Sequence, residues 1–167
     1  GGAADRVSKF YFDWRNRLVA SKAGYEASES TSLNRPIGYV EYDNLSEVIA
    51  AEQYDGDGVT IVDANSDGVP DKPSSSLLRA RSTTSFDDQG RMYATFTFSV
   101  NQSTGAISST SLATNLWYNR RGQVLKTSAP GGLVAKATVD GAARVVSSYL
   151  TDAGGDTAWS DAANVTG

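Results

Sequence analysis

The 167-residue chain has 15 basic and 19 acidic residues, a formal net charge of −4, and neither histidine nor cysteine. The two missing residue types exclude disulfides, thiolate nucleophiles, Cys/His zinc sites and Ser-His or Cys-His catalytic relays. The acidic balance and the lack of a basic cluster predict no nucleic-acid partner, because phosphate recognition needs grouped Lys or Arg. No apolar run approaches the ~18 residues of a membrane helix, so no membrane insertion is predicted. The only methionine is Met92, and we therefore expect a processed product or a section of a longer polypeptide.

β-Strand patterns dominate the chain. A first strand is expected from about Arg6, and residues 37–42, 93–100 and 143–150 are rich in β-branched and aromatic side chains that partly alternate with polar ones. Residues 44–54 could place apolar side chains on one helical face, but their neighbours make a hairpin the stronger prediction. The sequence thus predicts an all-β protein.

A seven-residue motif recurs five times without gaps. Its copies begin at residues 12, 42, 86, 118 and 139, which are 30, 44, 32 and 21 residues apart. Each copy has a large apolar residue, then Asp or Asn, then turn residues, a long polar residue and an aliphatic one. The motif residues of interest are Phe12, Asp13, Tyr42, Asp43, Phe86, Asp87, Gly90, Arg91, Tyr118, Asn119, Gly122, Asp140 and Arg144.

Each motif position has a physical role in a turn. The Asp or Asn side chain can accept a hydrogen bond from the backbone two residues on, and Gly90 and Gly122 can adopt the positive φ that closes a turn. The aromatic and the aliphatic residue then meet across two strands on a buried face, while the long polar residue points the other way. We therefore predict five β-hairpins, in which the motif residues are structural.

The longer spacings require insertions between hairpins. Residues 20–35, 55–76 and 101–115 are rich in Gly, Ser, Thr, Asn and Asp, and we expect them to be irregular.

The five motifs resemble the YD repeats of the rearrangement hotspot (RHS) family, which also occur in teneurins. The resemblance extends from Phe10 to about Leu150 and is closest at residues 86–92; the other copies lack the Gly, the Arg or the Tyr. It implies tandem antiparallel hairpins in a continuous spiralling or strip-like sheet. It further implies a large extracellular or surface-exposed protein with a structural, adhesive or encapsulating role. Residues 1–167 would then form a single module.

The insertion 55–76 is acidic and suggests a cation site. Oxygen ligands at alternate positions of a tight loop suit Ca²⁺, and the pattern is similar to thrombospondin type 3 or dockerin loops, although the twelfth position is Ser74 instead of the Glu of an EF-hand. A solvated Asp/Gly turn explains the same residues without a metal. The candidate ligands are Asp55, Asp57, Asp63, Asn65, Asp67, the Val69 carbonyl and Asp71.

The sequence favours no enzyme. Most candidate carboxylates occupy the turn position of the motif, where the hairpin already explains them. Trp14, Trp117 and Trp159 could stack on sugars, although packing explains most aromatic residues. Asn101 and Asn164 begin sequons in loop-like stretches and are possible glycosylation sites.

Three functions remain open. The leading hypothesis is an extracellular structural module that continues, through flanking repeats or copies of itself, into a fibre, strip or shell. An adhesive module that binds surface glycans is the second, and a shell fragment around a toxin or other cargo is the third. A repetitive sheet leaves strand edges exposed at its ends, which favours continuation.

Overall fold

The computed structural model describes residues 7–25 and 35–152, and these form strands and connecting loops. Within these residues, no helix is long and apolar enough to cross a membrane. The strands are β1 (Ser8–Phe12), β2 (Leu18–Ala23), β3 (Ile37–Tyr42), β4 (Val48–Tyr54), β5 (Leu78–Phe86), β6 (Met92–Val100), β7 (Ile107–Tyr118), β8 (Val124–Ser128), β9 (Val134–Val139) and β10 (Val145–Thr151), and a 3₁₀ turn, η1 (Ser75–Leu77), precedes β5.

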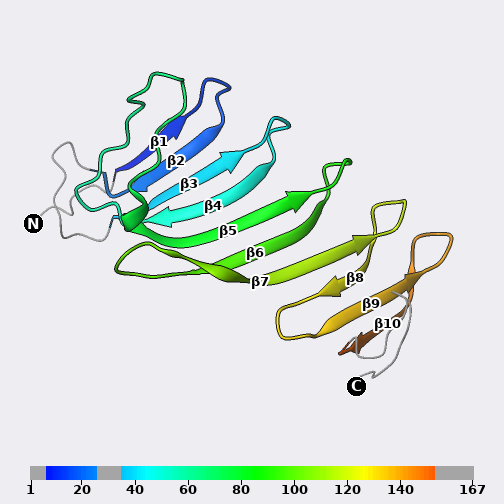
Figure 1. Ribbon diagram of the computed structural model, residues 1–167. Coiled ribbons are helices and arrows are strands. Elements are labelled where there is room, and N and C mark those ends of the chain that lie inside the picture. The colour runs from blue at the N-terminus through cyan, green and yellow to red at the C-terminus, as the bar shows by residue number, and fades with distance from the viewer. Residues whose placement is uncertain (1–6, 26–34, 153–167) are drawn as a thin grey trace, which may run out of the picture. The chain divides into compact units, whose positions relative to one another are not determined.

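The strands lie in the sheet in the order in which they occur in the chain, from β1 to β10 (Figure 1). The resolved pairings of β1 to β5 and of β7 to β10 are all antiparallel. Each of the five motifs joins two neighbouring strands. The predicted all-β fold of tandem hairpins is therefore confirmed.

Most of the expected strands are present. Residues 37–42 coincide with β3, residues 93–100 lie within β6, and residues 48–54 form β4 in place of the alternative helix. The expected irregular insertion at 101–115 is wrong for residues 107–115, which belong to β7, and the one at 20–35 is wrong for residues 20–23, which belong to β2. The Ser and Thr residues of β7 fit a strand whose side chains are mostly exposed or half-buried, since neither face then demands apolar residues.

All five turns share one backbone geometry. The amide of the motif Asp or Asn donates to the carbonyl four residues on, and the amide three residues on donates back to its carbonyl. The residue in that third place has positive φ in every copy. It is glycine only twice; the five are Asn16, Ser46, Gly90, Gly122 and Ala143. The predicted roles of Gly90 and Gly122 are confirmed, and other residues take the same conformation.

The predicted cross-strand pairs form, but not on a buried face. Phe12 lies opposite Leu18, and Tyr42 lies opposite Val48. Phe12 is nevertheless 51% exposed and Leu18 38%. The expectation of burial is therefore wrong for Phe12 and Leu18, whereas Tyr42 is half-buried and packs against the core cluster. Immediately beyond each pair the register shifts, as in a hairpin with a β-bulge.

The chain divides into two compact units. The first comprises residues 1–83 and 97–111, and the second comprises residues 84–96 and 112–167. Strands β5, β6 and β7 contribute to both.

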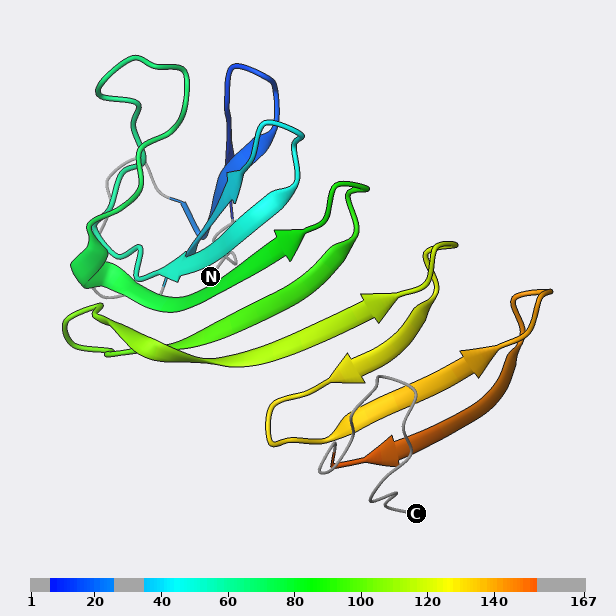
Figure 2. The ribbon, with the colours of Figure 1, turned by 45° about the vertical axis from the view of Figure 1, so that its right-hand side comes forward.

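The first unit contains the main hydrophobic core. Its loop between β4 and β5 returns along β1 to β4 (Figure 2). Ile61 from that loop is buried with strand residues, and Val59 and Val69 pack against the same cluster. The loop thereby supplies a second layer that the strands lack. The buried apolar residues of this cluster are Val19, Ala20, Ile37, Tyr39, Tyr54, Ile61, Leu78 and Val100.

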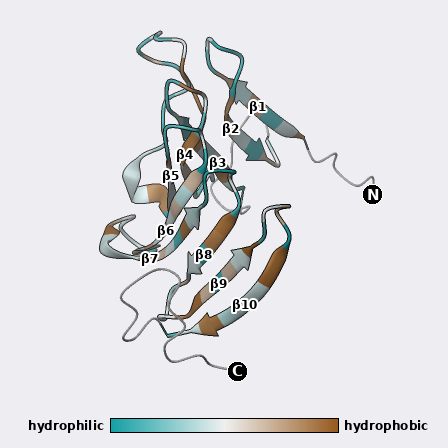
Figure 3. Ribbon diagram, turned by 90° about the vertical axis from the view of Figure 1, so that its right-hand side faces the viewer, coloured by the Kyte–Doolittle hydropathy of each residue, from teal (hydrophilic) through white to brown (hydrophobic). Residues whose placement is uncertain are grey.

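The second unit is more exposed. Its buried apolar residues, within the described part of the chain, are Ala94 and Val134. Both ends of β10 are apolar (Figure 3), and Val145, Val146 and Leu150 there are exposed to solvent. Backbone pairing and contacts between turns must therefore contribute most of the order in this unit.

Candidate functional site at the hairpin turns

The turn of the first hairpin is organised by one carboxylate. Asp13 Oδ1 accepts hydrogen bonds from the amides of Arg15 and Arg17, at 2.9 and 2.8 Å. Its Oδ2 accepts the Arg17 Nε–H at 2.7 Å. One side chain therefore fixes both the turn backbone and the direction of the arginine.

The same arrangement recurs at two other turns. Asp87 accepts the Gln89 and Arg91 amides, and its Oδ2 accepts Arg91 Nε–H at 2.8 Å. At the fifth turn, Asp140 accepts the Arg144 amide at 2.9 Å and Arg144 Nε–H at 2.7 Å.

The second and fourth turns keep the backbone bonds but have another long side chain. Asp43 Oδ1 accepts the Leu45 and Glu47 amides, each at 2.9 Å. Asn119 Oδ1 accepts the Gln123 amide, and the Asn119 side-chain amide donates to Gln123 Oε1 at 2.8 Å. All five predicted Asp or Asn positions therefore organise a turn.

The three Asp–Arg pairs lower the carboxyl pKa values. Hydrogen bonds from the Arg91 side chain and backbone lower the pKa of Asp87, and those from the Arg144 backbone and side chain lower that of Asp140. Burial would raise the pKa of Asp13, but its hydrogen bonds with Arg17 outweigh that effect and lower it. These carboxylates are held ionised, which suits a structural role better than proton transfer.

The arginine of the first turn also reaches the second hairpin. Arg17 Nη1–H donates to the Asp43 carbonyl at 3.1 Å, and the guanidinium lies 4.6 Å from the centre of the Tyr42 ring. In return, the Tyr42 hydroxyl donates to the Leu18 carbonyl at 3.0 Å. We call this set of contacts, from the Arg of one turn to the Tyr and Asp or Asn of the next, the clasp.

A second clasp joins the third and fourth hairpins. Arg91 Nη1–H donates to the Asn119 carbonyl at 3.2 Å, and its guanidinium lies 4.8 Å from the Tyr118 ring centre. The Tyr118 hydroxyl donates to the Met92 carbonyl at 2.5 Å. The expectation that the long polar residue points away from the aromatic positions is therefore wrong for Arg17 and Arg91. Each lies over the aromatic residue of the following hairpin.

The fourth and fifth hairpins are joined differently. Gln123 donates through its side-chain amide to the Ala143 carbonyl at 2.8 Å, and Arg121 Nη1–H donates to the Gly141 carbonyl at 2.6 Å. The fifth motif begins with Val139, which has neither a ring nor a hydroxyl. These two side-chain bonds between turns thus replace the clasp.

The acidic insertion is held onto the first unit by hydrogen bonds. The buried Lys22 donates through Nζ to the Gly56 and Val59 carbonyls, at 2.6 and 2.5 Å. The Tyr39 hydroxyl donates to the Pro70 carbonyl at 2.7 Å. Its pKa is raised to about 12, first by burial and then by nearby carboxylates, so it remains a donor.

The seven predicted metal ligands are not gathered at one point. Asp55 pairs with Arg79 at 3.2 Å, and Asp57 accepts the Arg35 amide at 2.8 Å. No group of three or more carboxylates within 7–25 and 35–152 is placed to hold a metal ion. Asp55 and Asp57 thus bond to residues outside the acidic loop of residues 63–71.

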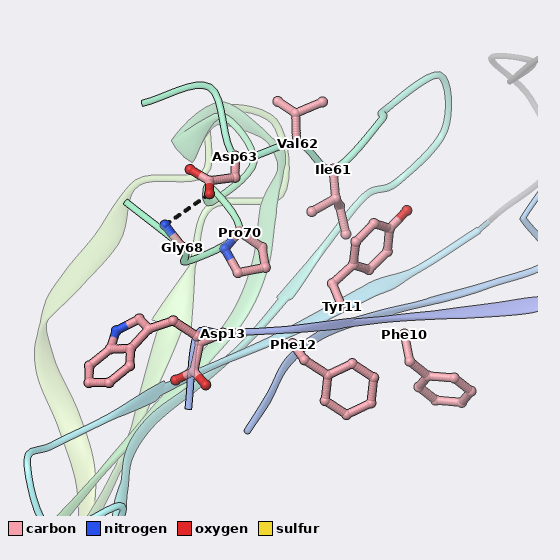
Figure 4. Close-up of a pocket in the computed structure, with 10 residues that line it drawn as sticks. Phe10, Tyr11, Phe12, Asp13, Ile61, Val62, Asp63, Gly68 and Pro70 are labelled. Carbon is pink, nitrogen blue, oxygen red and sulfur yellow. Dashed lines mark hydrogen bonds between the residues drawn. The ribbon is translucent and has the colours of Figure 1, made fainter. Parts of the chain in front are cut away.

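The remaining predicted ligands bond within their own loop. Asp63 Oδ2 accepts the Gly68 amide at 2.9 Å, as shown in Figure 4. Asp67 Oδ1 accepts the Val69 amide at 2.8 Å, and Asp67 Oδ2 accepts the Asn65 side-chain amide at 3.0 Å. Asp71 Oδ2 accepts the Ala64 amide at 2.8 Å. The loop conformation is thus stabilised by its own acidic side chains.

An open groove of about 480 Å³ lies between β1 and the insertion. Figure 4 shows Tyr11 directed toward Ile61, with Phe10 and Phe12 on the other side of the strand. Phe10, Phe12 and Trp14 are more than half exposed. Aromatic residues at alternate positions provide a surface that can stack on planar or sugar ligands.

Other predicted residues are distributed over the chain. Asn101 is exposed in the β6–β7 turn, where its side-chain oxygen accepts the Ser103 and Thr104 amides at 3.0 Å. Trp117 lies on β7 with Lys126 Nζ 4.4 Å from its ring centre. Asn164 and Trp159 lie outside the described residues.

Two functional features were not predicted. One is the clasp, whose signal is the coincidence of Arg in one motif with Tyr in the next. The other is the packing of the insertion, whose signal is the presence of Val59, Ile61 and Val69 among its acidic residues.

No protein-family model matches the sequence, and no curated protein matches it. Among solved structures, a chain of the crystal structure of TcdB2-TccC3-TEV aligns with 10% identity and a TM-score of 0.44. The alignment covers 86% of this chain and 8% of that one, so this chain spans less than a tenth of its length.

Proposed function

We propose that this chain is a non-catalytic structural module whose hairpin sheet continues end to end into a fibre, strip or shell, at the cell surface or outside the cell. The YD-repeat resemblance of its motifs supports this proposal. The continuation would come from flanking repeats or from copies of the chain.

The clasp is the observation that carries the proposal. It uses one hairpin's Arg and the next hairpin's Tyr, and it occurs with matching atoms at Arg17–Tyr42 and Arg91–Tyr118. At both junctions the contact runs from one repeat to the following one, so it has a direction. Head-to-tail contacts between like units produce closed rings or open filaments.

The ends of the sheet support the same proposal. In the described part of the chain, β1 and β10 each have one neighbouring strand. An unpaired strand edge presents backbone donors and acceptors that another strand can satisfy.

Electron microscopy and sedimentation velocity of the concentrated chain test the proposal. We expect elongated or closed assemblies that grow with protein concentration. Only monomers at every concentration, with and without calcium, would contradict assembly by the chain itself.

Calcium binding by the acidic loop remains a prediction. The carboxylate and carbonyl oxygens of residues 63–71 are of the right type, and three of the carboxylates also accept backbone amides of the same loop. Isothermal titration of the chain with CaCl₂, beside Asp63→Asn and Asp67→Asn, measures this directly. Heat that saturates in the parent and is lost in both variants would support a site, whereas equal heats would reject it.

A glycan-binding surface is a second candidate, favoured by the exposed Phe10, Phe12 and Trp14 beside the groove. A glycan array on the parent chain, repeated with Trp14→Ala and Phe12→Ala, tests it. Binding that both substitutions abolish would support this function, and an array without binding would remove it.

A further inference from the structure

The last described hairpin presents an Asp–Arg turn with a highly exposed guanidinium. Asp140 orients Arg144 through the same Nε–Oδ2 bond as the other two Asp–Arg turns, at 2.7 Å. The Arg144 side chain is 79% exposed, compared with 20% for Arg17 and 26% for Arg91. The difference corresponds to the Tyr and turn carbonyl that cover Arg17 and Arg91.

The residue that follows Arg144 shows the same difference. Leu18 and Met92 accept a tyrosine hydroxyl at their carbonyls and are 38% and 37% exposed. Val145 is the matching residue of the fifth hairpin and is 63% exposed. Thus the guanidinium and the apolar residue that take part in a clasp are both exposed at this turn.

We propose that the Asp140–Arg144–Val145 turn is a docking site for a further β-hairpin that carries Tyr followed by Asp or Asn at its own turn. The inference rests on the proposed function and specifies its partner. The incoming Tyr ring covers the Arg144 guanidinium and its hydroxyl donates to the Val145 carbonyl. The carbonyl of the incoming Asp or Asn accepts an Arg144 Nη–H.

The partner chemistry follows from the two internal examples. Both clasps use tyrosine, whose ring attracts the cation and whose hydroxyl supplies a bond that phenylalanine cannot make. Arg144 adds a charge-assisted donor already oriented by Asp140, so little ordering is needed on binding.

This chain does not itself supply the complete partner at its ends. The first motif of a second copy carries Phe12 and lacks the hydroxyl, and residues 153–167 contain no tyrosine. A head-to-tail copy would therefore make an incomplete clasp. The site selects a Tyr-bearing hairpin from outside these residues over the first hairpin of another copy.

A cyclised, fluorescein-labelled peptide of residues 113–128 is a suitable probe, because it contains Tyr118 and Asn119 at a hairpin turn. Its binding to the full chain is measured by fluorescence anisotropy. We expect Arg144→Gln to weaken binding about tenfold, and a Tyr118→Phe probe to weaken it about fivefold. The matched control Arg120→Gln removes the charge of an exposed arginine in another turn and should leave binding unchanged.

The outcomes separate this inference from the proposed function. Absence of probe binding, or equal binding to Arg144→Gln and the parent chain, overturns the docking site whether or not the chain assembles. Arg144-dependent binding of the Tyr probe supports the site even if microscopy shows only monomers, in which case self-assembly alone is rejected.

Discussion

The two units of the chain share one kind of hairpin but differ in what covers their strands. In the first unit, the β4–β5 insertion packs Ile61 into the cluster formed by Ile37 and its neighbours. The second unit has no such insertion within its described residues, 84–96 and 112–152, and most side chains of β10 are exposed. The turn geometry therefore does not depend on a hydrophobic core, because Asp13 in the first unit and Asp140 in the second make the same bonds.

The two units also differ in what stabilises them. Burial of apolar area acts mainly in the first unit, and its magnitude depends on the insertion remaining in place. The clasp acts in both units, once in each, since Arg17–Tyr42 lies in the first and Arg91–Tyr118 in the second.

The largest effect is expected from Ile37→Ala. Ile37 is fully buried in the first unit, so we expect the free energy of unfolding of that unit to fall by about 3 kcal/mol. Urea titration is followed by Trp14 fluorescence in a chain with Trp117 and Trp159 replaced by Phe. The control Val146→Ala removes an exposed side chain of the second unit and should change the free energy by less than about 0.5 kcal/mol. An equal effect of the two substitutions would contradict the difference in burial.

A substitution at Gly56 should weaken the packing of the insertion against the sheet and lower the stability of the first unit. A Cβ there would lie 2.1 Å from the Arg35 carbonyl oxygen and 2.8 Å from Ile37 Cγ1, so Gly56→Ala should cost about 1–3 kcal/mol. At Gly141, in the second unit, a Cβ meets nothing within 4 Å. Gly141→Ala should therefore be neutral or slightly stabilising. Thermal melts of both variants measure the contrast, and a tolerated Gly56→Ala would show that the close approach is unimportant.

The clasp should have a similar coupling energy in both units. A double-mutant cycle of Arg91→Gln with Tyr118→Leu, and a second one of Arg17→Gln with Tyr42→Leu, isolates the contribution of the guanidinium–ring pair, because Leu removes the ring. We expect about 0.5–1 kcal/mol for each, because the guanidiniums are partly exposed and solvent screens the interaction. Additive effects of the single substitutions would mean that the contact does not stabilise the hairpin pair.

The smallest effect on stability is expected from lowering the pH. The pKa values of Asp13, Asp87 and Asp140 are lower in the folded chain than the ordinary value of 3.8. Their contribution to stability is therefore complete above that value and is lost as the pH falls through the folded-state pKa. Urea midpoints measured from pH 6 to pH 2 should fall less steeply in Asp87→Asn than in the parent chain. Identical slopes would exclude Asp87 from the acid response.

The positions of the five motif turns and of most strands could be predicted from the sequence. The Asp or Asn at 13, 43, 87, 119 and 140 locates the five motif hairpins, because its bonds are local and depend on residues within the motif. The burial of the motif side chains could not be predicted correctly, since burial depends on whether a second layer covers the sheet. The extent of β7 was missed because Ser and Thr are typical of both loops and exposed strands.

The candidate sites were predicted less completely. The Asp residues of the acidic insertion indicate a solvated or calcium-binding loop, but they do not indicate how the loop is attached. Its attachment depends on Lys22 and Tyr39, which lie far from it in sequence. The clasp likewise joins residues that are distant along the chain, such as Arg17 and Tyr42. Contacts between motifs require the register of the strands, which the composition of a single motif does not contain.

Hydrogen exchange tests whether the insertion is the second layer of the first unit. The measurement compares the parent chain with a shortened chain in which a Gly-Ser linker replaces residues 59–72. The parent chain should show slower amide exchange in β3 and β4 than in β9 and β10, because exchange there requires exposure of the core. In the shortened chain, protection of β3 and β4 should fall to that of β9 and β10, which should themselves be unchanged. Unaltered protection of β3 and β4 without the insertion would show that the insertion is not the layer that protects the first unit.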